Sequence, residues 1–239
     1  MVKRALPHQD RDEPRPIVVL TGAGISAESG LATFRGAGGL WEGHRVEEVA
    51  TPEAFARNPA LVQRFYNLRR AQLLDPAVRP NPAHLALARL EREWPAEVLI
   101  VTQNVDDLHE RAGSRRVLHM HGELLRAACL SCRRSSPWRE PLDDASICPG
   151  CGTLGRLRPD IVWFGEMPYR MDEIHEALLG CGLFLSVGTS GQVYPAAGFV
   201  EIVRDMGAAR TIEINLEPSA VATGFAEHRH GPASVRVPE

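Results

Sequence analysis

The feature that most constrains this chain is an apolar run at residues 98–101, which polar side chains follow directly. Its length and composition predict a buried strand, so Thr102, Gln103 and Asn104 lie at the carboxyl end of that strand. Asp106 comes next, at the start of a predicted helix. Ligands bind to open parallel sheets where the carboxyl ends of strands meet loops. The stretch therefore predicts a binding site, with helix capping as the alternative role for Asn104 and Asp106.

Two histidines, His119 and His121, end the same stretch, after a short predicted strand at 117–118. An unperturbed imidazole has a pKa of about 6.5, which suits a general base at physiological pH. Two positions apart on an extended segment, both rings point to the same side. The residue pattern alone leaves both histidines as candidate bases, and a structural core histidine as the alternative for His119.

A second buried strand, predicted at 17–20, runs into Gly22 and Gly24. Glycines at this spacing allow a tight turn and let backbone amides approach a pyrophosphate at a helix N-terminus. A dehydrogenase would then need a second strand ending in an acidic residue about 20 positions later. Residues 31–41 instead form a glycine-rich loop that contains Phe34 and Arg35, which fits a lid over a cofactor.

Four cysteines form two C-x-x-C pairs, Cys129 with Cys132 and Cys148 with Cys151, separated by fifteen residues. This spacing is typical of a four-thiolate zinc site. Two disulfides are the alternative, which the expected reducing compartment disfavours. A closed set of four thiolates has no open position for water, so we expect a structural zinc ion.

Composition and charge set the broader limits. The chain has 239 residues with a net charge of −3, so no strong field indicates nucleic acid or an anionic membrane as a partner. No apolar run reaches the ~20 residues of a membrane span, and residues 1–16 lack the apolar core of a signal peptide. We expect a cytoplasmic protein that binds neither membrane nor nucleic acid directly.

The remaining elements predict an α/β fold. Strands at 183–187 and 210–214 again end in small or polar residues, and helices are predicted at about 59–74, 83–93 and 195–206. Thr51 and Pro52 mark a helix N-terminus. The apolar segment 162–166 predicts an exposed edge that pairs with an extended peptide.

Taken together, the motifs resemble the sirtuin family of NAD-dependent protein deacylases, and specifically its class III-like bacterial members. They occur in the family order: GAGIS at 22–26, TQNVD at 102–106, HG at 121–122, the two C-x-x-C pairs, GTS at 188–190 and IN at 214–215. The match extends from residue 17 to about 237. The resemblance implies a Rossmann-like NAD-binding domain (16–36, 84–122 and 158–239), a helical lobe with the cofactor loop (37–83) and an inserted zinc-binding lobe (123–157).

The resemblance also implies residue roles. The cofactor residues are Gly22, Ala23, Gly24, Thr33, Phe34, Arg35, Gln103, Asn104, Asp106, Gly188, Thr189, Ser190, Asn215, Glu217 and Ala233. Val162, Phe164, Gly165 and Glu166 would pair with the substrate peptide, and His121 would be the general base. Where relatives have proline, this chain has Ala32, which should loosen the cofactor loop.

The implied reaction consumes NAD, removes acetyl groups, and also succinyl or malonyl groups, from lysines of acylated proteins, and yields nicotinamide and O-acyl-ADP-ribose. Tyr66 and Arg69 share one helical face, where a phenol and a guanidinium can bind an acyl carboxylate. A core Tyr66 and solvated Arg69 and Arg70 are the alternative, which the small residue Ala50 disfavours. Two rival functions remain: an NAD-dependent ADP-ribosyltransferase, and a non-catalytic module that binds acyl-lysine or NAD.

Overall fold

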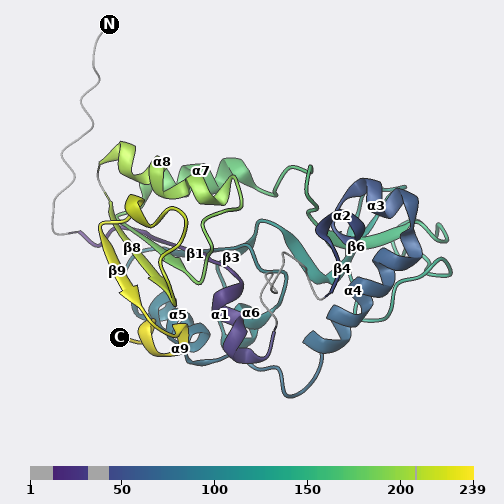
Figure 1. Ribbon diagram of the computed structural model, residues 1–239, viewed down its shortest axis with the longest axis horizontal. Helices are drawn as coiled ribbons and strands as arrows, with labels where there is room; N and C mark the ends of the chain where they lie inside the picture. The colour runs from purple at the N-terminus through teal and green to yellow at the C-terminus, as the bar shows by residue number, and fades with distance from the viewer. Residues whose placement is uncertain (1–12, 32–42, 208) are drawn as a thin grey trace, which may run out of the picture.

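A six-stranded parallel sheet forms the larger part of the molecule (Figure 1). The structure is a computed structural model, of which residues 13–31, 43–207 and 209–239 are described. The strands are β1 (Ile17–Thr21), β2 (Val98–Thr102), β3 (Val117–His119), β7 (Leu183–Val187), β8 (Arg210–Asn215) and β9 (Glu227–His230). Their spatial order is β3-β2-β1-β7-β8-β9, the doubly wound order. The order reverses between β1 and β7, and ligands bind at such a point.

Helices cover both faces of this sheet. They are α1 (Ala23–Ser26), α5 (Pro82–Glu93), α6 (Leu108–Ala112), α7 (Met171–Gly180), α8 (Phe199–Met206) and α9 (Ala233–Arg236), with 3-10 turns η1 (Ala27–Ser29), η2 (Ala196–Gly198) and η3 (Ala222–Gly224). In Figure 1, α7 and α8 lie on one face and α5 and α9 on the other. None of the described helices is long and apolar enough to cross a membrane.

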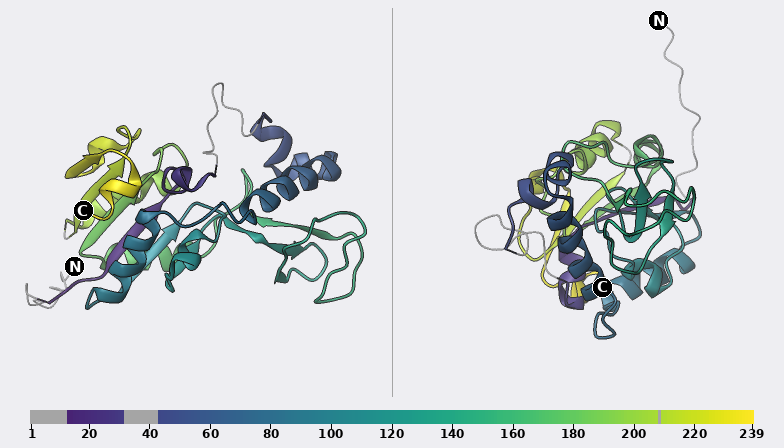
Figure 2. Two further views of the ribbon diagram at one scale, coloured as in Figure 1. Left: turned by 90° about the horizontal axis from the view of Figure 1, so that it is seen from below. Right: turned by 90° about the vertical axis from the view of Figure 1, so that its right-hand side faces the viewer.

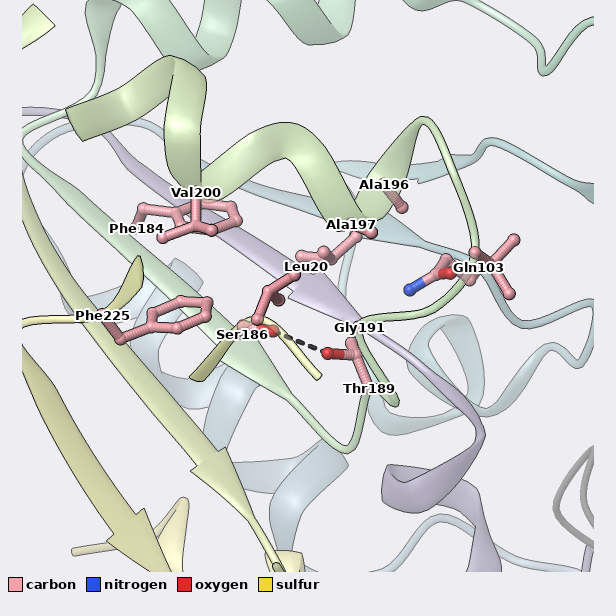
Figure 3. A pocket seen from close by; sticks show the side chains of 12 residues that line it. Leu20, Gln103, Phe184, Ser186, Thr189, Gly191, Ala196, Ala197, Val200 and Phe225 are labelled. Carbon is pink, nitrogen blue, oxygen red and sulfur yellow. Dashed lines mark hydrogen bonds between the residues drawn. The ribbon is translucent and has the colours of Figure 1, made fainter. Parts of the chain in front are cut away.

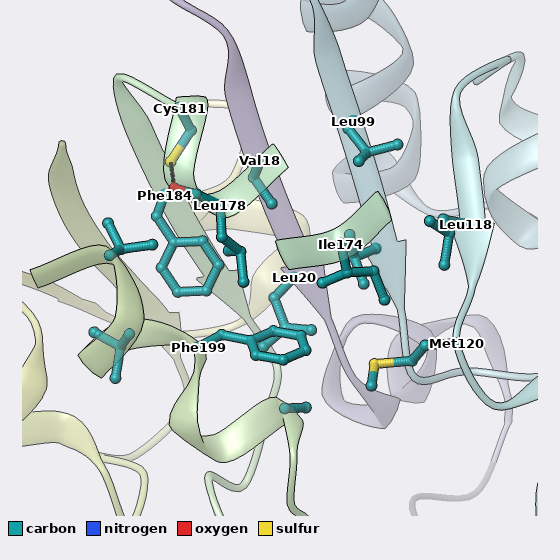
Figure 4. Packing of buried hydrophobic residues seen from close by; sticks show 14 of the residues in the cluster. Val18, Leu20, Leu99, Leu118, Met120, Ile174, Leu178, Cys181, Phe184 and Phe199 are labelled. Carbon is teal, nitrogen blue, oxygen red and sulfur yellow. Dashed lines mark hydrogen bonds between the residues drawn. The ribbon is translucent and has the colours of Figure 1, made fainter. Parts of the chain in front are cut away.

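Alternation along β1 divides the core into two layers. Val18 and Leu20 pack with Phe184 and Phe199 under α7 and α8, as Figure 4 shows. Ile17 and Val19 belong to the opposite layer, beside α5 and α9. Successive strand residues point to opposite faces, so a strand that is buried on both faces is apolar throughout. This explains why the central strands read as continuous apolar runs in the sequence.

A smaller lobe lies at the end of the molecule remote from β8 and β9 (Figures 1 and 2). It contains an antiparallel sheet of order β5-β4-β6, formed by β4 (Gly122–Cys129), β5 (Ser135–Pro137) and β6 (Leu157–Ile161). Beside it pack the helices α2 (Val46–Val49), α3 (Pro52–Arg57) and α4 (Pro59–Leu73). Thr51 caps α3 as predicted, since its Oγ1 accepts from the Ala54 amide at 3.0 Å.

The predicted α/β class, parallel sheet and inserted cysteine-containing lobe are confirmed. The helix expected at 195–206 is instead η2 followed by α8. The segment 162–166 is not extended throughout, because the chain leaves β6 after Ile161 and forms a turn in which the Glu166 amide donates to the Trp163 carbonyl. Its pairing with a peptide stays a prediction. The three domain boundaries stay predictions.

Candidate active site

The loops after β1 and β7 touch each other backbone to backbone at the switch point. The Gly22 amide donates to the Val187 carbonyl at 3.0 Å, and the Gly24 amide donates to the Gly188 carbonyl at 2.9 Å. A Cβ atom at Gly24 would lie 2.7 Å from the Gly188 Cα, closer than packed atoms can approach. Gly188 also has φ +63°, in the region that favours glycine. Both loops therefore require glycine at these positions.

Three side chains join the β1 loop to the β2 loop. The Asn104 Nδ2 donates to the Gly22 carbonyl and to the Ser26 Oγ, both at 3.1 Å. Ser26 in turn donates to the Asp106 Oδ2 at 3.0 Å. Sequence reasoning gave Ser26 no role of its own, although it is the last residue of the GAGIS motif. The predicted amide of Asn104 and carboxylate of Asp106 are thus linked through the Ser26 hydroxyl, next to the glycine turn.

Asp106 is buried beside this network, and its other oxygen accepts from the Leu108 amide at 3.1 Å. Burial raises the pKa of Asp106, although the hydrogen bonds from Leu108 and Ser26 act in the opposite direction. The capping alternative therefore holds in part for Asp106, at the start of α6. It does not hold for Asn104, whose side chain bonds to the β1 loop instead.

The two candidate bases bind successive carbonyls of the β2 loop but differ at their second nitrogen. His121 Nδ1 lies 3.2 Å from the Gln103 carbonyl, and His119 Nδ1 lies 3.2 Å from the Asn104 carbonyl. The His119 Nε2 contacts Glu110 at 2.8 Å. The His121 Nε2 has no hydrogen bond to any part of the chain that the structure describes.

Their pKa values move in opposite directions. Burial lowers the pKa of His121, and its bond to the Gln103 carbonyl offsets this only in part. Burial also acts to lower the pKa of His119, but the hydrogen bond and charge of Glu110 outweigh it and raise that pKa. A carbonyl only accepts, so His121 carries its proton on Nδ1 and presents a lone pair on Nε2. Of the two imidazoles, only His121 has the form of a general base.

The other side of the crevice is formed by the β7 and β8 loops. Asn215 Nδ2 donates to the Thr189 carbonyl at 2.6 Å, and the hydroxyls of Thr189 and Ser186 lie 2.9 Å apart. Figure 3 shows Thr189 and Gln103 at a cavity of about 10 Å³ between the sheet and α8. That volume suits one water molecule, so this cavity is a detail of the crevice floor.

The remaining predicted cofactor residues are more dispersed. Ser190 is half-buried beside Thr189, Glu217 is exposed beyond β8, and Ala233 is buried at the first turn of α9. Thr33, Phe34 and Arg35, and the departure Ala32, lie outside the described residues. What the crevice does offer is a turn of small residues at the switch point, which a pyrophosphate can approach closely, and this fits a dinucleotide.

The segment predicted to hold the peptide is a turn that the protein's own groups fix. The Val162 amide donates to the His121 carbonyl at 2.9 Å, and the Phe164 amide donates to the Ala50 carbonyl at 3.0 Å. Glu166 accepts from the Trp163 amide and is paired with Arg158. Phe164 and Gly165 are exposed at the tip of the turn. The segment therefore joins His121 to the residue that precedes the α3 cap.

Tyr66 and Arg69 share one face of α4, and Tyr66 contacts this turn. Tyr66 is fully buried, and its hydroxyl accepts from the Trp163 Nε1 at 2.9 Å. Arg69 is half-buried, with its guanidinium 5.2 Å from the centre of the Phe65 ring. The alternative of a core Tyr66 agrees with this burial, whereas its solvated Arg70 does not, because Arg70 is buried and donates to the Leu124 carbonyl at 3.1 Å.

The four cysteines of the small lobe gather at one point. Their sulfur atoms all lie within 4.8 Å of one another, with Cys129–Cys151 and Cys132–Cys148 each 3.8 Å apart. A tetrahedron with zinc–sulfur bonds of ~2.3 Å has edges of about 3.8 Å, whereas a disulfide needs ~2.05 Å. The Cys148 sulfur also accepts from the Gly150 amide at 3.4 Å. This donor set fits a structural zinc ion.

With the geometry established, comparisons with known proteins identify the class. The Sir2 family model matches residues 22–195. A "NAD-dependent protein deacylase" of Bdellovibrio bacteriovorus is 61% identical over 222 residues, which cover 93% of each chain. The chain therefore belongs to the Sir2 family, the sirtuins, as the ordered motifs predicted.

Solved structures agree with this assignment. A Sir2 homologue in complex with NAD has a TM-score of 0.84 at 40% identity, and the match covers 93% of this chain and 86% of the other. A Sir2 protein bound to an acetylated peptide has a TM-score of 0.79 at 28% identity, covering 95% and 92%. The fold described above is thus the Sir2 fold.

Proposed function

We propose that this chain is an NAD-dependent protein-lysine deacylase that removes acetyl groups and, in addition, acidic acyl groups such as succinyl and malonyl. The observation that carries the proposal is the pair of imidazoles on the β2 loop, of which His119 is held at both nitrogens and His121, bonded to the Gln103 carbonyl, presents a free lone pair at Nε2. Relatives of similar length named as deacylases support the reaction class. A module that only binds NAD or acyl-lysine has no need of a base at this place.

NAD would lie across the crevice, with its phosphates near Gly22, Gly24 and Gly188, and would supply the activated ribose carbon to which the acyl oxygen bonds as nicotinamide leaves. Asn104 and Asp106 would hold the nicotinamide end. His121 would accept the proton of a ribose hydroxyl at Nε2, while its Nδ1–H stays on the Gln103 carbonyl. Its lowered pKa keeps the ring neutral at pH 7, so a proton can be taken up.

Tyr66 and Arg69 would bind the terminal carboxylate of an acidic acyl group. Burial raises the pKa of Tyr66, so its phenol stays neutral and can donate to a carboxylate at any working pH. Arg69 supplies a guanidinium, which matches a carboxylate bidentately. Both lie on α4, and Tyr66 bonds to Trp163, a residue of the turn that we propose for the peptide.

The first experiment offers one peptide in acetyl-lysine and succinyl-lysine forms, with and without NAD, and follows the products by mass spectrometry. We expect NAD-dependent loss of both groups together with the matching O-acyl-ADP-ribose. His121→Ala should lower kcat by about 10²–10⁴-fold. Release of nicotinamide without loss of any acyl group would instead indicate ADP-ribosyl transfer, and binding without turnover would indicate a non-catalytic module.

The acyl preference is tested with Arg69→Met, assayed with both peptides. Loss of a buried charge-assisted contact costs roughly 2–5 kcal/mol, so the kcat/KM for succinyl-lysine should fall at least about tenfold further than that for acetyl-lysine. Arg64→Met is the matched control, because Arg64 is exposed on the same helix. Equal losses for both substrates would return Arg69 to a structural role without affecting the deacylase assignment.

A further inference from the structure

Two imidazoles that the proposed mechanism does not use lie buried together beneath the β1 loop. His84 belongs to α5 and His109 to α6; both are 0% exposed, and their ring centres are 5.0 Å apart. A buried polar group costs free energy unless it is hydrogen-bonded. The hydrogen bonds that these two rings make, and the ring nitrogens that remain unpaired, therefore show which tautomer each ring adopts.

The His84 ring is fixed by the N-terminus of its own helix. Its Nδ1 lies 3.4 Å from the Asn81 amide, which only donates. His84 Nδ1 is therefore an acceptor, and the proton of the neutral ring is on Nε2. The Nε2 atom is buried and has no hydrogen-bond partner among the described residues.

The His109 ring is fixed from the other side by the end of β1. Its Nε2 lies 3.0 Å from the Thr21 hydroxyl, which donates a hydrogen bond to the Thr102 Oγ1 at 2.9 Å. The Thr21 oxygen therefore accepts from His109, whose proton is on Nε2. Its Nδ1, which is buried and unpaired within the described chain, is then an acceptor. The His84 Nε2–H donor and the His109 Nδ1 acceptor thus both remain buried and unpaired in neighbouring rings.

The chain of bonds from His109 ends at the nicotinamide side of the crevice. The Thr102 Oγ1, which accepts a hydrogen bond from Thr21, also accepts one from the Asn104 amide at 3.0 Å. Asn104 then donates through its side chain to the Gly22 carbonyl. Burial lowers the pKa of His84 to about 4 and that of His109 well below its ordinary value, which keeps both rings neutral at pH 7.

We propose that His109 is a positioning residue for NAD. In its Nε2–H form it donates to the Thr21 hydroxyl, orients the Thr21 and Thr102 hydroxyls and so fixes the backbone of Asn104. His109 itself touches neither cofactor nor substrate. This inference rests on the proposed role of Asn104 in holding the nicotinamide end of NAD.

The tautomer can be read directly on the unmodified protein, without any activity. Long-range ¹H–¹⁵N spectra of ¹⁵N-histidine protein distinguish Nε2–H, Nδ1–H and imidazolium rings. We expect His109 and His84 both as neutral Nε2–H tautomers at pH 7, assigned by comparison with His109→Gln and His84→Gln. An Nδ1–H or charged His109 overturns the proposal, because Thr21 would then not be oriented as described.

The functional consequence is tested with two substitutions at His109. His109→Leu leaves the Thr21 hydroxyl without its donor, and an unsatisfied buried polar group costs about 1–3 kcal/mol. We expect the KM for NAD to rise by about tenfold or more, with a smaller change in kcat. His109→Gln can place an amide N–H near the position of Nε2 and should restore the KM to within about threefold.

Leu87→Ala is the control, since Leu87 is a buried residue of α5 outside this chain of bonds. It should lower the melting temperature without changing the KM for NAD. If His109→Leu behaves in the same way as this control, the role is structural and the proposal fails. Should the protein prove not to be a deacylase, the spectra and calorimetric NAD affinities of the same variants still decide the inference by themselves.

Discussion

The two sheets of this molecule are stabilised in different ways. The central strands β1 and β2 of the parallel sheet are buried along their whole length between two apolar layers. Around the cysteines of the antiparallel sheet the apolar cluster has only five buried members, and two of them are the metal-ligand candidates Cys129 and Cys148. Apolar burial contributes roughly 25 cal/mol per Å², so this small cluster stabilises the region around the cysteines only weakly. The other end of the sheet, with Leu124 and Ile161, packs instead into a larger apolar cluster with the helices α2 to α4. The difference indicates a larger lobe held by apolar burial and a smaller lobe whose cysteine-containing end depends on its metal.

The two lobes meet at the candidate base. His121 immediately precedes β4, its carbonyl accepts from Val162 just after β6, and Gly122 pairs with Ile161. A Cβ atom at Gly122 would lie 2.1 Å from the Asp160 carbonyl, so only glycine fits here. Loss of the metal should therefore be transmitted through the backbone to the crevice that holds the candidate base.

The largest effect should come from removing the metal. Structural zinc contributes about 10–16 kcal/mol in zinc-finger peptides, so a chelator, or Cys148→Ser, should abolish hydrogen-exchange protection in β4 and β6. Protection in β1, β2 and β7 should persist, while activity is lost. The measurement is peptide-resolved hydrogen exchange together with zinc content. Loss of protection in both sheets together would contradict the division into two differently stabilised lobes.

The next largest effect is the loss of stability of the larger lobe at acidic pH. Burial lowers the pKa of His84 to about 4, below the unfolded value of ~6.5. Between these values the unfolded chain binds more protons, so stability is full above pH ~6.5 and falls as the pH drops towards 4, by roughly 3 kcal/mol in total. In His84→Gln this part of the pH dependence should disappear, as followed by denaturant unfolding at fixed zinc.

His175→Gln is the control for this titration, because His175 is exposed on α7. Its unfolding free energy should follow the wild-type pH profile. If His84→Gln also follows the wild-type profile between pH 4 and 6.5, the acid sensitivity of the larger lobe has another origin.

How far the sequence predicts each lobe differs for a physical reason. Strand ends and glycine turns are local, so β1, β2, β7 and the polar residues after them could be placed from apolar runs alone. The cysteine spacing likewise gave the metal site. The roles of Ser26, and of Thr21 with His109, could not be predicted, because these bonds join residues about 80 positions apart. The turn at 162–166 was missed because its amides bond to His121 and Ala50, which lie elsewhere in the chain.

A smaller effect is expected where the two cofactor loops touch. Gly24→Ala forces the loops apart, because the new Cβ would lie 2.8 Å from the Gly188 carbonyl oxygen. Overpacking of this kind costs typically about 1–3 kcal/mol, and NAD affinity measured by calorimetry should fall as well. Gly180→Ala is the matched control, since a Cβ there meets no atom of the described chain within 4 Å. Equal melting temperatures for the two variants would show that the loops are not tightly packed.

The smallest effect tests the helices of the smaller lobe, which carry none of the four cysteines. Thr51→Ala removes the cap that accepts the Ala54 amide, and a lost N-cap costs about 1 kcal/mol. Thr51→Ser keeps the hydroxyl and should stay close to wild type. The Phe164 amide, in the turn at 162–166, donates to the carbonyl of Ala50, which directly precedes Thr51. If that turn binds the peptide as proposed, Thr51→Ala should also raise the KM for the peptide more than that for NAD. A loss of about 1 kcal/mol here, compared with the loss of protection in β4 and β6 on zinc removal, would show that the metal stabilises the antiparallel sheet far more than a helix cap stabilises the lobe.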